Sequence, residues 1–261
     1  MTLLIGANLD LYTIVWADTR TTSYYPVIGP IHQDGDHKII VSNAGLLTGS
    51  GNKDVLDFVK QEFLSKDFLH TNDILDFMKK EVIPMIEDFQ IRYPYMNIIT
   101  CFLLSYITTL NNETKLRLAL IHPQWDYDMG FYDDSIVIMP HDASEESARI
   151  HNETLRQSLI KLDNRISTQA SDDEYIGFLL GSIISNVKII AKHFTQISQE
   201  SSCVSHDLDI VIHILNGSLI YFYGKSCDIM KGIVKFSIIP VARQFRVFSP
   251  AIFDEGETIE I

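Results

Sequence analysis

The chain has 261 residues, of which 46% are hydrophobic and 21% are charged, and its formal net charge at pH 7 is −13. This size and composition are those of a globular protein with one large domain or two small ones. Because the excess charge is negative, the composition argues against nucleic acid and against an anionic membrane surface as partners.

The first third of the chain is expected to form four strands and then two helices. Short β-prone runs at 3–7 and 13–17 flank turn residues, and a second pair at 38–41 and 46–48 flanks Asn43-Ala44-Gly45. Between the two pairs, residues 24–35 are rich in Gly, Pro and Tyr and are expected to form a polar loop. From residue 52 the apolar spacing becomes helical, which predicts one helix over 55–64 and another over 75–89, with Thr71 or Asn72 as its cap.

The remaining two thirds of the chain return to strands, then to helices, and then to strands. Strands are predicted at 97–108, 115–121 and 136–139, followed by an amphipathic helix over 143–162 with Asp142 as its cap. The next helix, 175–194, is apolar around most of its circumference, so we expect it to be buried between layers. Strands at 207–215 and 219–223 flank Asn216-Gly217, a strong hairpin signal, and a last strand is expected at 233–241.

This order of elements predicts the fold class. Paired strands followed by paired helices favour antiparallel sheets covered by helical layers, whereas single strands alternating with helices would favour a parallel sheet. No repeat or linker divides the sequence. We therefore predict one α+β domain over residues 1–261, built as two antiparallel sheets between two helical layers.

The sequence also carries weak signals about cellular location. No basic segment precedes the first apolar run, and no apolar run reaches the roughly 18 residues that a membrane-spanning helix requires. The three cysteines are widely spaced and form no CxxC pair, so neither a disulfide framework nor a zinc site is indicated. We expect a cytoplasmic protein without a signal peptide.

The first fifty residues carry the chemistry. Thr2 directly follows the initiator methionine, which is removed from many proteins when the next side chain is small. A threonine at the N-terminus can act as nucleophile through its hydroxyl and as base through its own α-amine, whose ordinary pKa is roughly 7.7–8.0. A nearby lysine would lower the pKa of that amine, and a carboxylate would keep the lysine charged. Lys38 and Asp18 are the candidates for these two roles.

This segment resembles the N-terminus of proteasome β-subunits and of their bacterial relatives of the HslV and Anbu type. In that family a threonine opens the first strand, an Asp-x-Arg-x-Thr motif closes the second, a lysine opens the third, and a small glycine-containing loop precedes the first helix. The corresponding positions in this chain are Thr2, Asp18-Thr19-Arg20-Thr21-Thr22, Lys38 and Gly49-Ser50-Gly51. The resemblance implies the αββα sandwich of the N-terminal-nucleophile hydrolases, with the residues from about 226 onward as a C-terminal extension.

The same resemblance implies roles for individual residues. Thr2 would be the nucleophile and base, Lys38 the cation that tunes the amine, and Asp18 the partner of that cation. Arg20 would be a structural anchor beside the substrate site.

The resemblance also implies substrate contacts and partners. Thr22 and the backbone of Gly49, Ser50 and Gly51 would hold an extended peptide, and an amide N–H of that loop would stabilise the oxyanion. The implied activity is cleavage of peptide bonds through an acyl-enzyme, without a cofactor, in peptides or unfolded proteins. The implied assembly is a self-compartmentalising homo-oligomer, a ring or a stack of rings, with an ATPase as a further partner.

Two serine positions of the family are less clearly matched. Before the third helix the family has Gly-Ser-Gly, and here the candidate is Ser144 in Met139-Pro140-His141-Asp142-Ala143-Ser144. After the fourth helix the family has Asp-x-x-Ser-Gly, and here the candidate is Ser202, with Gln199 or Glu200 in place of the aspartate.

Two alternative functions stay open on the sequence. A catalytically inactive scaffold or interaction subunit would have the same fold, and a small-molecule amidase would use the same N-terminal chemistry. A metal site near His141 or His206 is not favoured, because neither histidine has a partner at ligand spacing on one helix face. We therefore predict no metal.

Overall fold

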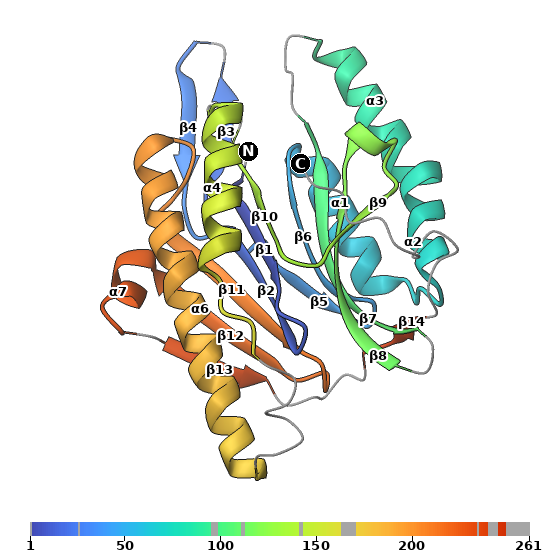
Figure 1. Cartoon of the computed structure of the whole chain (residues 1–261). Coiled ribbons are helices and arrows are strands. Elements are labelled where there is room, and N and C mark those ends of the chain that lie inside the picture. The colour runs from blue at the N-terminus through green and yellow to red at the C-terminus, as the bar shows by residue number, and fades with distance from the viewer. Residues whose placement is uncertain are drawn as a thin grey trace.

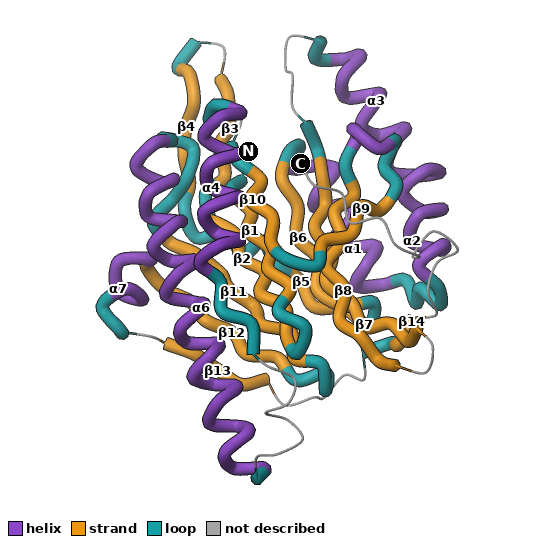
Figure 2. Tube along the Cα trace, in the orientation of Figure 1, coloured by secondary structure: helices purple, strands orange, loops and turns teal. Residues whose placement is uncertain are grey.

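The computed structural model of the chain describes residues 2–25, 27–94, 99–110, 113–140, 143–162, 171–233, 235–239 and 245–248. These residues form four layers, with two β-sheets face to face and helices on both outer sides (Figure 1). Figure 2 shows the same order, with strands inside and helices outside. The predicted α+β class and the αββα order are confirmed.

The first sheet is antiparallel and has the strand order β10-β1-β2-β11-β12-β13. Its strands are β1 (Leu4–Asn8), β2 (Tyr12–Asp18), β10 (Ser135–Ile138), β11 (Asp207–Ile214), β12 (Leu219–Lys225) and β13 (Lys235–Ile239). The strand β1 opens the chain but lies inside the sheet, where Leu4 pairs with Ala17 of β2 and with Ile138 of β10. The residue before β1 is therefore placed at the end of an interior strand.

The second sheet has the order β5-β6-β7-β8-β9, all antiparallel, and β14 adds to β7 in parallel. Its strands are β5 (Ile40–Ser42), β6 (Gly45–Ser50), β7 (Cys101–Leu110), β8 (Glu113–Ile121), β9 (Met129–Tyr132) and β14 (Val247–Phe248). The strand β6 pairs with β7 up to Ser50, but it pairs with β5 only as far as Leu47. On that side, the last three residues of β6 have no strand partner among the described strands.

Helices cover the outer face of each sheet. On the second sheet lie α1 (Lys53–Ser65), α2 (Thr71–Phe77) and α3 (Ile83–Arg92), with a π-helical turn at Met78–Val82 between the last two. On the first sheet lie α4 (Glu145–Ser158) and α6 (Asp172–Glu200), and the short α7 (Ser226–Met230) packs beside α6. A 3-10 turn, Pro123–Trp125, follows β8. Helix α1 begins where the side chain of Asn52 accepts the N–H of Val55 at 3.1 Å, a standard N-cap.

Apolar side chains fill the space between all four layers. One cluster lies between the first sheet and helices α4 and α6, and it includes Trp16 stacked on Phe194 with ring centroids 5.3 Å apart. A second cluster lies between the second sheet and helices α1 to α3. A third joins the facing sides of the two sheets and includes Leu4, Ala17 and Leu103. Successive side chains of β1 thus point to opposite faces of the sheet and pack into different clusters, as strand geometry requires.

Several element boundaries differ from the sequence predictions. The expected polar loop over 24–35 contains a two-stranded hairpin, β3 (Thr21–Tyr25) and β4 (Gly29–Gln33). The second helix is capped by His70 rather than by Thr71 or Asn72. Helix α4 is shorter than 143–162 and is capped by Ser144, while the predicted cap Asp142 lies outside the described residues. The strand predicted at 97–108 begins only at Cys101, and residues 97 and 98 lie outside the described residues.

Helix α6 is longer and more exposed than predicted. It spans 29 residues, and Ile176, Leu180 and Ile184 on one of its sides are exposed, so the helix is buried on one face rather than between layers. By length and composition alone, Asp173–Glu200 is the one helix of the described chain that could cross a membrane, although its inner face packs on the first sheet. The sequence has no uninterrupted apolar run of that length, but α6 reaches it when the few polar residues within the helix are included.

Candidate active site

Thr2 lies two residues before the first residue of β1 and is held by its main chain. Its N–H donates to Ser50 Oγ at 3.0 Å, and the same hydroxyl donates to the C=O of Thr2 at 3.0 Å. Thr2 is 4% exposed, Ser50 is fully buried, and Met1 lies outside the described residues. The last residue of β6 in the second sheet therefore fixes the start of β1 in the first.

Lys38 contacts the hydroxyl of Thr2. Its Nζ donates to Thr2 Oγ1 at 2.7 Å and to the C=O of Arg20, and it lies 3.7 Å from Asp18 Oδ1. The lysine is 5% exposed. A lysine ammonium has three N–H groups, and here each has an oxygen to approach. This geometry fits the charged form of Lys38, with one N–H directed at the candidate nucleophile.

Asp18 closes β2 and is completely buried. Its Oδ1 accepts the N–H of Leu3 at 2.8 Å, and its Oδ2 accepts the N–H groups of Arg20 at 3.0 Å and Ser205 at 3.5 Å. The carboxylate thus joins the residue after Thr2 to the end of β2 and to the segment before β11. It also supplies a negative charge next to Lys38.

Burial dominates the electrostatics of this pair. Loss of water lowers the pKa of Lys38 below its ordinary value, although the charges of Asp18 and Asp36 oppose that shift. Loss of water also raises the pKa of Asp18, and the charge of Lys38 and three backbone N–H groups oppose that shift. Both directions are those expected for charged groups taken out of water. A lysine with a lowered pKa can change its protonation more readily than one in solvent.

Arg20 and Thr22 lie beside this cluster but contact other groups. The Arg20 guanidinium binds both carboxylate oxygens of Asp34, at 2.8 and 3.0 Å, and donates to the C=O of Ser202 at 2.7 Å. The hydroxyl of Thr22 lies 3.0 Å from Nδ1 of His32 across the β3–β4 hairpin. Arg20 thus anchors two loops, and Thr22 lies on a hairpin outside the second sheet.

Neighbouring atoms leave no room for a Cβ at Gly49 or Gly51. A Cβ on Gly49 would lie 2.9 Å from the carbonyl oxygen of Cys101, and one on Gly51 would lie 2.5 Å from Cα of Thr100. Gly51 also has a φ of +133°, which side chains other than glycine rarely adopt. The loop packs directly against the first residues of β7, while the opposite edge of β6 is without a strand partner in the described chain.

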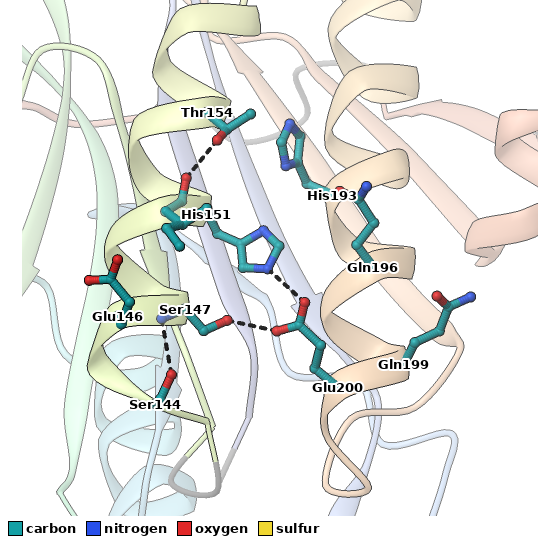
Figure 3. Close-up of a pocket in the computed structure, with 10 residues that line it drawn as sticks. Ser144, Glu146, Ser147, His151, Thr154, His193, Gln196, Gln199 and Glu200 are labelled. Carbon is teal, nitrogen blue, oxygen red and sulfur yellow. Dashed lines mark hydrogen bonds and ion pairs between the residues drawn. The ribbon is translucent and has the colours of Figure 1, made fainter.

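Neither predicted serine lies in this cluster. Ser144 caps α4, where its Oγ accepts the N–H of Ser147 at 3.1 Å, and it lines a groove of about 570 Å³ between α4 and α6 (Figure 3). The groove also holds His151, whose Nε2 lies 3.3 Å from Glu200. Ser202 is exposed, and its C=O rather than its side chain contacts Arg20. Within the described residues, no hydrogen bond joins either serine side chain to Thr2, Asp18 or Lys38.

Ser205 is the serine that the structure brings to the cluster. It is fully buried, its N–H faces Asp18, and its Oγ lies 3.1 Å from the hydroxyl of Thr19 and donates to the C=O of Asp207 at 2.5 Å. The sequence prediction selected Ser202 because it matches the serine of the family's Asp-x-x-Ser-Gly motif, with Gln199 or Glu200 in place of the aspartate. No local sequence signal marked Ser205, which reaches Asp18 because β11 pairs with β2.

The cluster brings together several groups that can take part in acid–base and nucleophilic chemistry. Within the described ranges, no group of three His, Cys, Asp or Glu side chains is arranged to hold a metal ion. The arrangement instead offers a hydroxyl, a backbone nitrogen directly beside it in the same residue, and a buried lysine and aspartate. These groups can support nucleophilic attack by Thr2 once its nitrogen is a free amine.

Comparisons with known proteins agree with this fold. No family model matches the sequence, and no curated protein matches it. Among solved structures, Anbu from Hyphomicrobium sp. strain MC1 matches with a TM-score of 0.52 and 12% identity, over 88% of this chain and 92% of that chain. Anbu from Yersinia bercovieri, described as an ancestral β-subunit, matches with a TM-score of 0.54 and 12% identity over the same shares.

These likenesses concern the fold. The chain has the fold of the Anbu proteins, and the resemblance to proteasome-type β-subunits inferred from its first fifty residues is confirmed at that level.

Proposed function

We propose that this chain, which folds like the Anbu proteins, is an N-terminal-nucleophile hydrolase that cleaves amide bonds through Thr2 after removal of Met1. The observation that carries the proposal is the 2.7 Å contact from Lys38 Nζ to Thr2 Oγ1, with Asp18 behind the lysine. A buried lysine directed at a threonine hydroxyl has little structural purpose, because burying its charge is costly. A catalytic purpose accounts for that cost.

The proposed reaction uses both groups of Thr2. Its Oγ1 forms a bond to the carbonyl carbon of the substrate while the hydroxyl proton passes to the free α-amine, and the carbonyl oxygen becomes an oxyanion. The amine then gives the proton to the leaving nitrogen as the C–N bond breaks, which leaves an ester on Thr2. Water, deprotonated by the same amine, hydrolyses that ester. The charge of Lys38 favours the deprotonated states of both the hydroxyl and the amine.

The proposed substrate is an extended peptide or a segment of unfolded protein. The support is the edge of β6, where Thr48, Gly49 and Ser50 have no strand partner among the described residues on the side away from β7. An extended peptide can add to such an edge through main-chain hydrogen bonds. A backbone N–H of the 49–51 loop would then lie near the oxyanion.

We also propose a homo-oligomer in the cytoplasm, with an ATPase that supplies unfolded substrate as a further partner. The support for self-association is the exposed apolar row on α6, made of Ile176, Leu180 and Ile184 at a spacing of four residues. An exposed apolar row of this kind favours contact with another protein surface, because contact removes its side chains from water. Sedimentation of the wild type and of Leu180→Lys tests this: the substitution should shift the protein toward monomer, and a monomeric wild type would contradict the proposal.

One observation favours the alternative of a catalytically inactive scaffold. Thr2 is only 4% exposed, so a substrate cannot reach it in this conformation. Removal of Met1 must therefore open the site if the chain is an enzyme. A small-molecule amidase would need a smaller opening than a protease, and substrate profiling would separate these two.

The test has two steps. The intact mass of purified protein shows whether Met1 is removed, and quantitative retention of Met1 would rule out the amine chemistry. A β-lactone probe should then label the wild type on Thr2, and Thr2→Ser should keep labelling while Thr2→Ala loses it. Lys38→Met should lower the labelling rate by about 100-fold or more, in the range that a removed acid–base group costs. Labelling that persists in Thr2→Ala would contradict the proposal.

A further inference from the structure

The segment that carries Lys38 has no regular secondary structure of its own. Residues 34–39 run between β4 and β5 without strand or helix hydrogen bonds. The position of Lys38 therefore depends on contacts that tie its neighbours to the rest of the protein. Such contacts decide how closely the amine approaches Thr2.

Two anchors tie the segment to the end of β2 and the start of β3. Asp34 forms the double contact with Arg20, and Asp36 Oδ2 accepts the hydroxyl of Thr21 at 2.8 Å. The N–H of Asp36 also donates to the C=O of Thr19 at 3.1 Å.

A third anchor comes from β11 and acts on the residue directly before Lys38. Nδ1 of His37 lies 2.9 and 3.0 Å from the two carboxylate oxygens of Asp209 and 3.4 Å from the hydroxyl of Tyr221. The side chain of His37 is 71% exposed, whereas that of Asp209 is 1% exposed. A buried carboxylate on β11 thus holds a surface imidazole, in a geometry that a solvated histidine would not adopt by itself.

We propose that Asp209, acting through His37, is a positioning residue for Lys38. This inference rests on the proposed function, because Asp209 has a positioning role only if Lys38 acts on Thr2. Fixing the ring of His37 fixes the backbone from which the lysine stem reaches Thr2. Without it the described contacts of the segment before Lys38 are those of residues 34–36, and the amine can move toward solvent.

Other charged groups surround this contact and bear on its test. Lys60 of α1 acts on Asp209, and its pKa is lowered first by its own burial. Lys53 of α1 lies 3.6 Å from Asp36. On β12, burial and then the charge of Asp209 raise the pKa of Tyr221. When His37 is replaced, Lys60 remains as the nearby cation for Asp209.

The test measures the titration of the Lys38 amine by NMR in protein labelled with ¹³Cε-lysine, with the signal assigned by its absence in Lys38→Arg. Burial is the main reason that the pKa of Lys38 is low, so a loosened amine should titrate at higher pH. We expect His37→Ala and Asp209→Ala each to raise the midpoint by about 0.5 to 1 pH unit. Asp209→Asn, which keeps a hydrogen-bond acceptor, should give a smaller rise.

The direction of the shift separates positioning from simple charge effects. If Asp209 acted on Lys38 only through its charge, removing that charge would lower the midpoint, and His37→Ala would leave it unchanged. Glu81→Gln is the matched control, because it removes one negative charge from an exposed site on the other side of the second sheet. His37→Ala changes an exposed side chain and keeps the test available if Asp209→Ala does not fold.

The outcomes also separate this proposal from the proposed function. An unchanged or lowered midpoint in both alanine variants would overturn the positioning role, whether or not the wild type is labelled by the β-lactone. A raised midpoint in the alanine variants, together with a wild type that the probe does not label, would support positioning and contradict the hydrolase. If both proposals hold, His37→Ala should also slow labelling of Thr2 by about tenfold, as expected for a displaced catalytic group.

Discussion

His213 should make the protein less stable in mild acid, by an amount that can be worked out from its surroundings. It lies on β11 between the two sheets and is completely buried. Its Nδ1 lies 3.2 Å from the hydroxyl of Ser105, which lies 2.5 Å from that of Thr13, and its Nε2 has no partner among the described residues. Burial lowers the pKa of His213 to about 3.

The sign and size of the effect follow from proton linkage. Below roughly pH 6.5 the unfolded chain protonates this histidine, but the folded chain does not do so until about pH 3. Stability present at neutral pH is therefore lost as the pH falls through this window. Each pH unit contributes about 1.36 kcal/mol, so lowering the pH from 6.5 to 4.5 should cost roughly 3 kcal/mol of unfolding free energy.

Urea unfolding followed by fluorescence, at pH 7 and pH 4.5, measures this loss. His213→Gln keeps a polar side chain that can reach Ser105, and His213→Leu fills the space with an apolar one. Both should lose roughly 3 kcal/mol less than the wild type on acidification, because all other titrating groups are shared. Equal losses in the wild type and both variants would refute the reasoning.

Three further substitutions test other parts of the structure. Ser50→Ala removes the hydroxyl that bonds both the N–H and the C=O of Thr2, so urea unfolding should show a loss of about 2–4 kcal/mol, and an unchanged stability would contradict that geometry. Ser144→Ala removes only the cap of α4, so it should cost about 1 kcal/mol and leave Thr2 labelling at the wild-type rate; a loss of labelling would return Ser144 to the site. Gly45→Ala should give no soluble protein, because an added Cβ would overlap the carbonyl oxygen of Ser105; expression at the wild-type level would argue against this contact.

Much of the fold could be predicted because its patterns are local. The short, nearly continuous apolar run of β2 and the Asn216-Gly217 turn between β11 and β12 each point to one structure. The β3–β4 hairpin was missed because β4 carries Gly29 and Pro30 and its side chains are largely exposed. Its pairing comes from backbone hydrogen bonds that leave little trace in hydrophobicity.

In the candidate site, the residues of the N-terminal motif could be predicted, whereas those that depend on strand pairing could not. Thr2, Asp18 and Lys38 were predicted from a motif, and the structure brings them together. Ser50 was expected to bind substrate through its backbone, whereas its hydroxyl holds Thr2. Ser205 and the Asp209 contact could not be predicted, because they depend on how β11 is placed beside β2, and that register is a property of the whole sheet.

The interior position of β1 also sets an order of events during synthesis. Under the proposed function, Thr2 is synthesised early, but β1 can pair with β10 only after residue 138 is made, and Asp18 can contact Ser205 only later still. Until then the peptide bond before Thr2 is open to a methionine-removing enzyme. Folding then buries Thr2, which is 4% exposed in the folded chain and whose N–H donates to Ser50 Oγ. Removal of Met1 is therefore expected to precede folding. Whether Thr2 has a free α-amine then depends on whether removal or folding is faster.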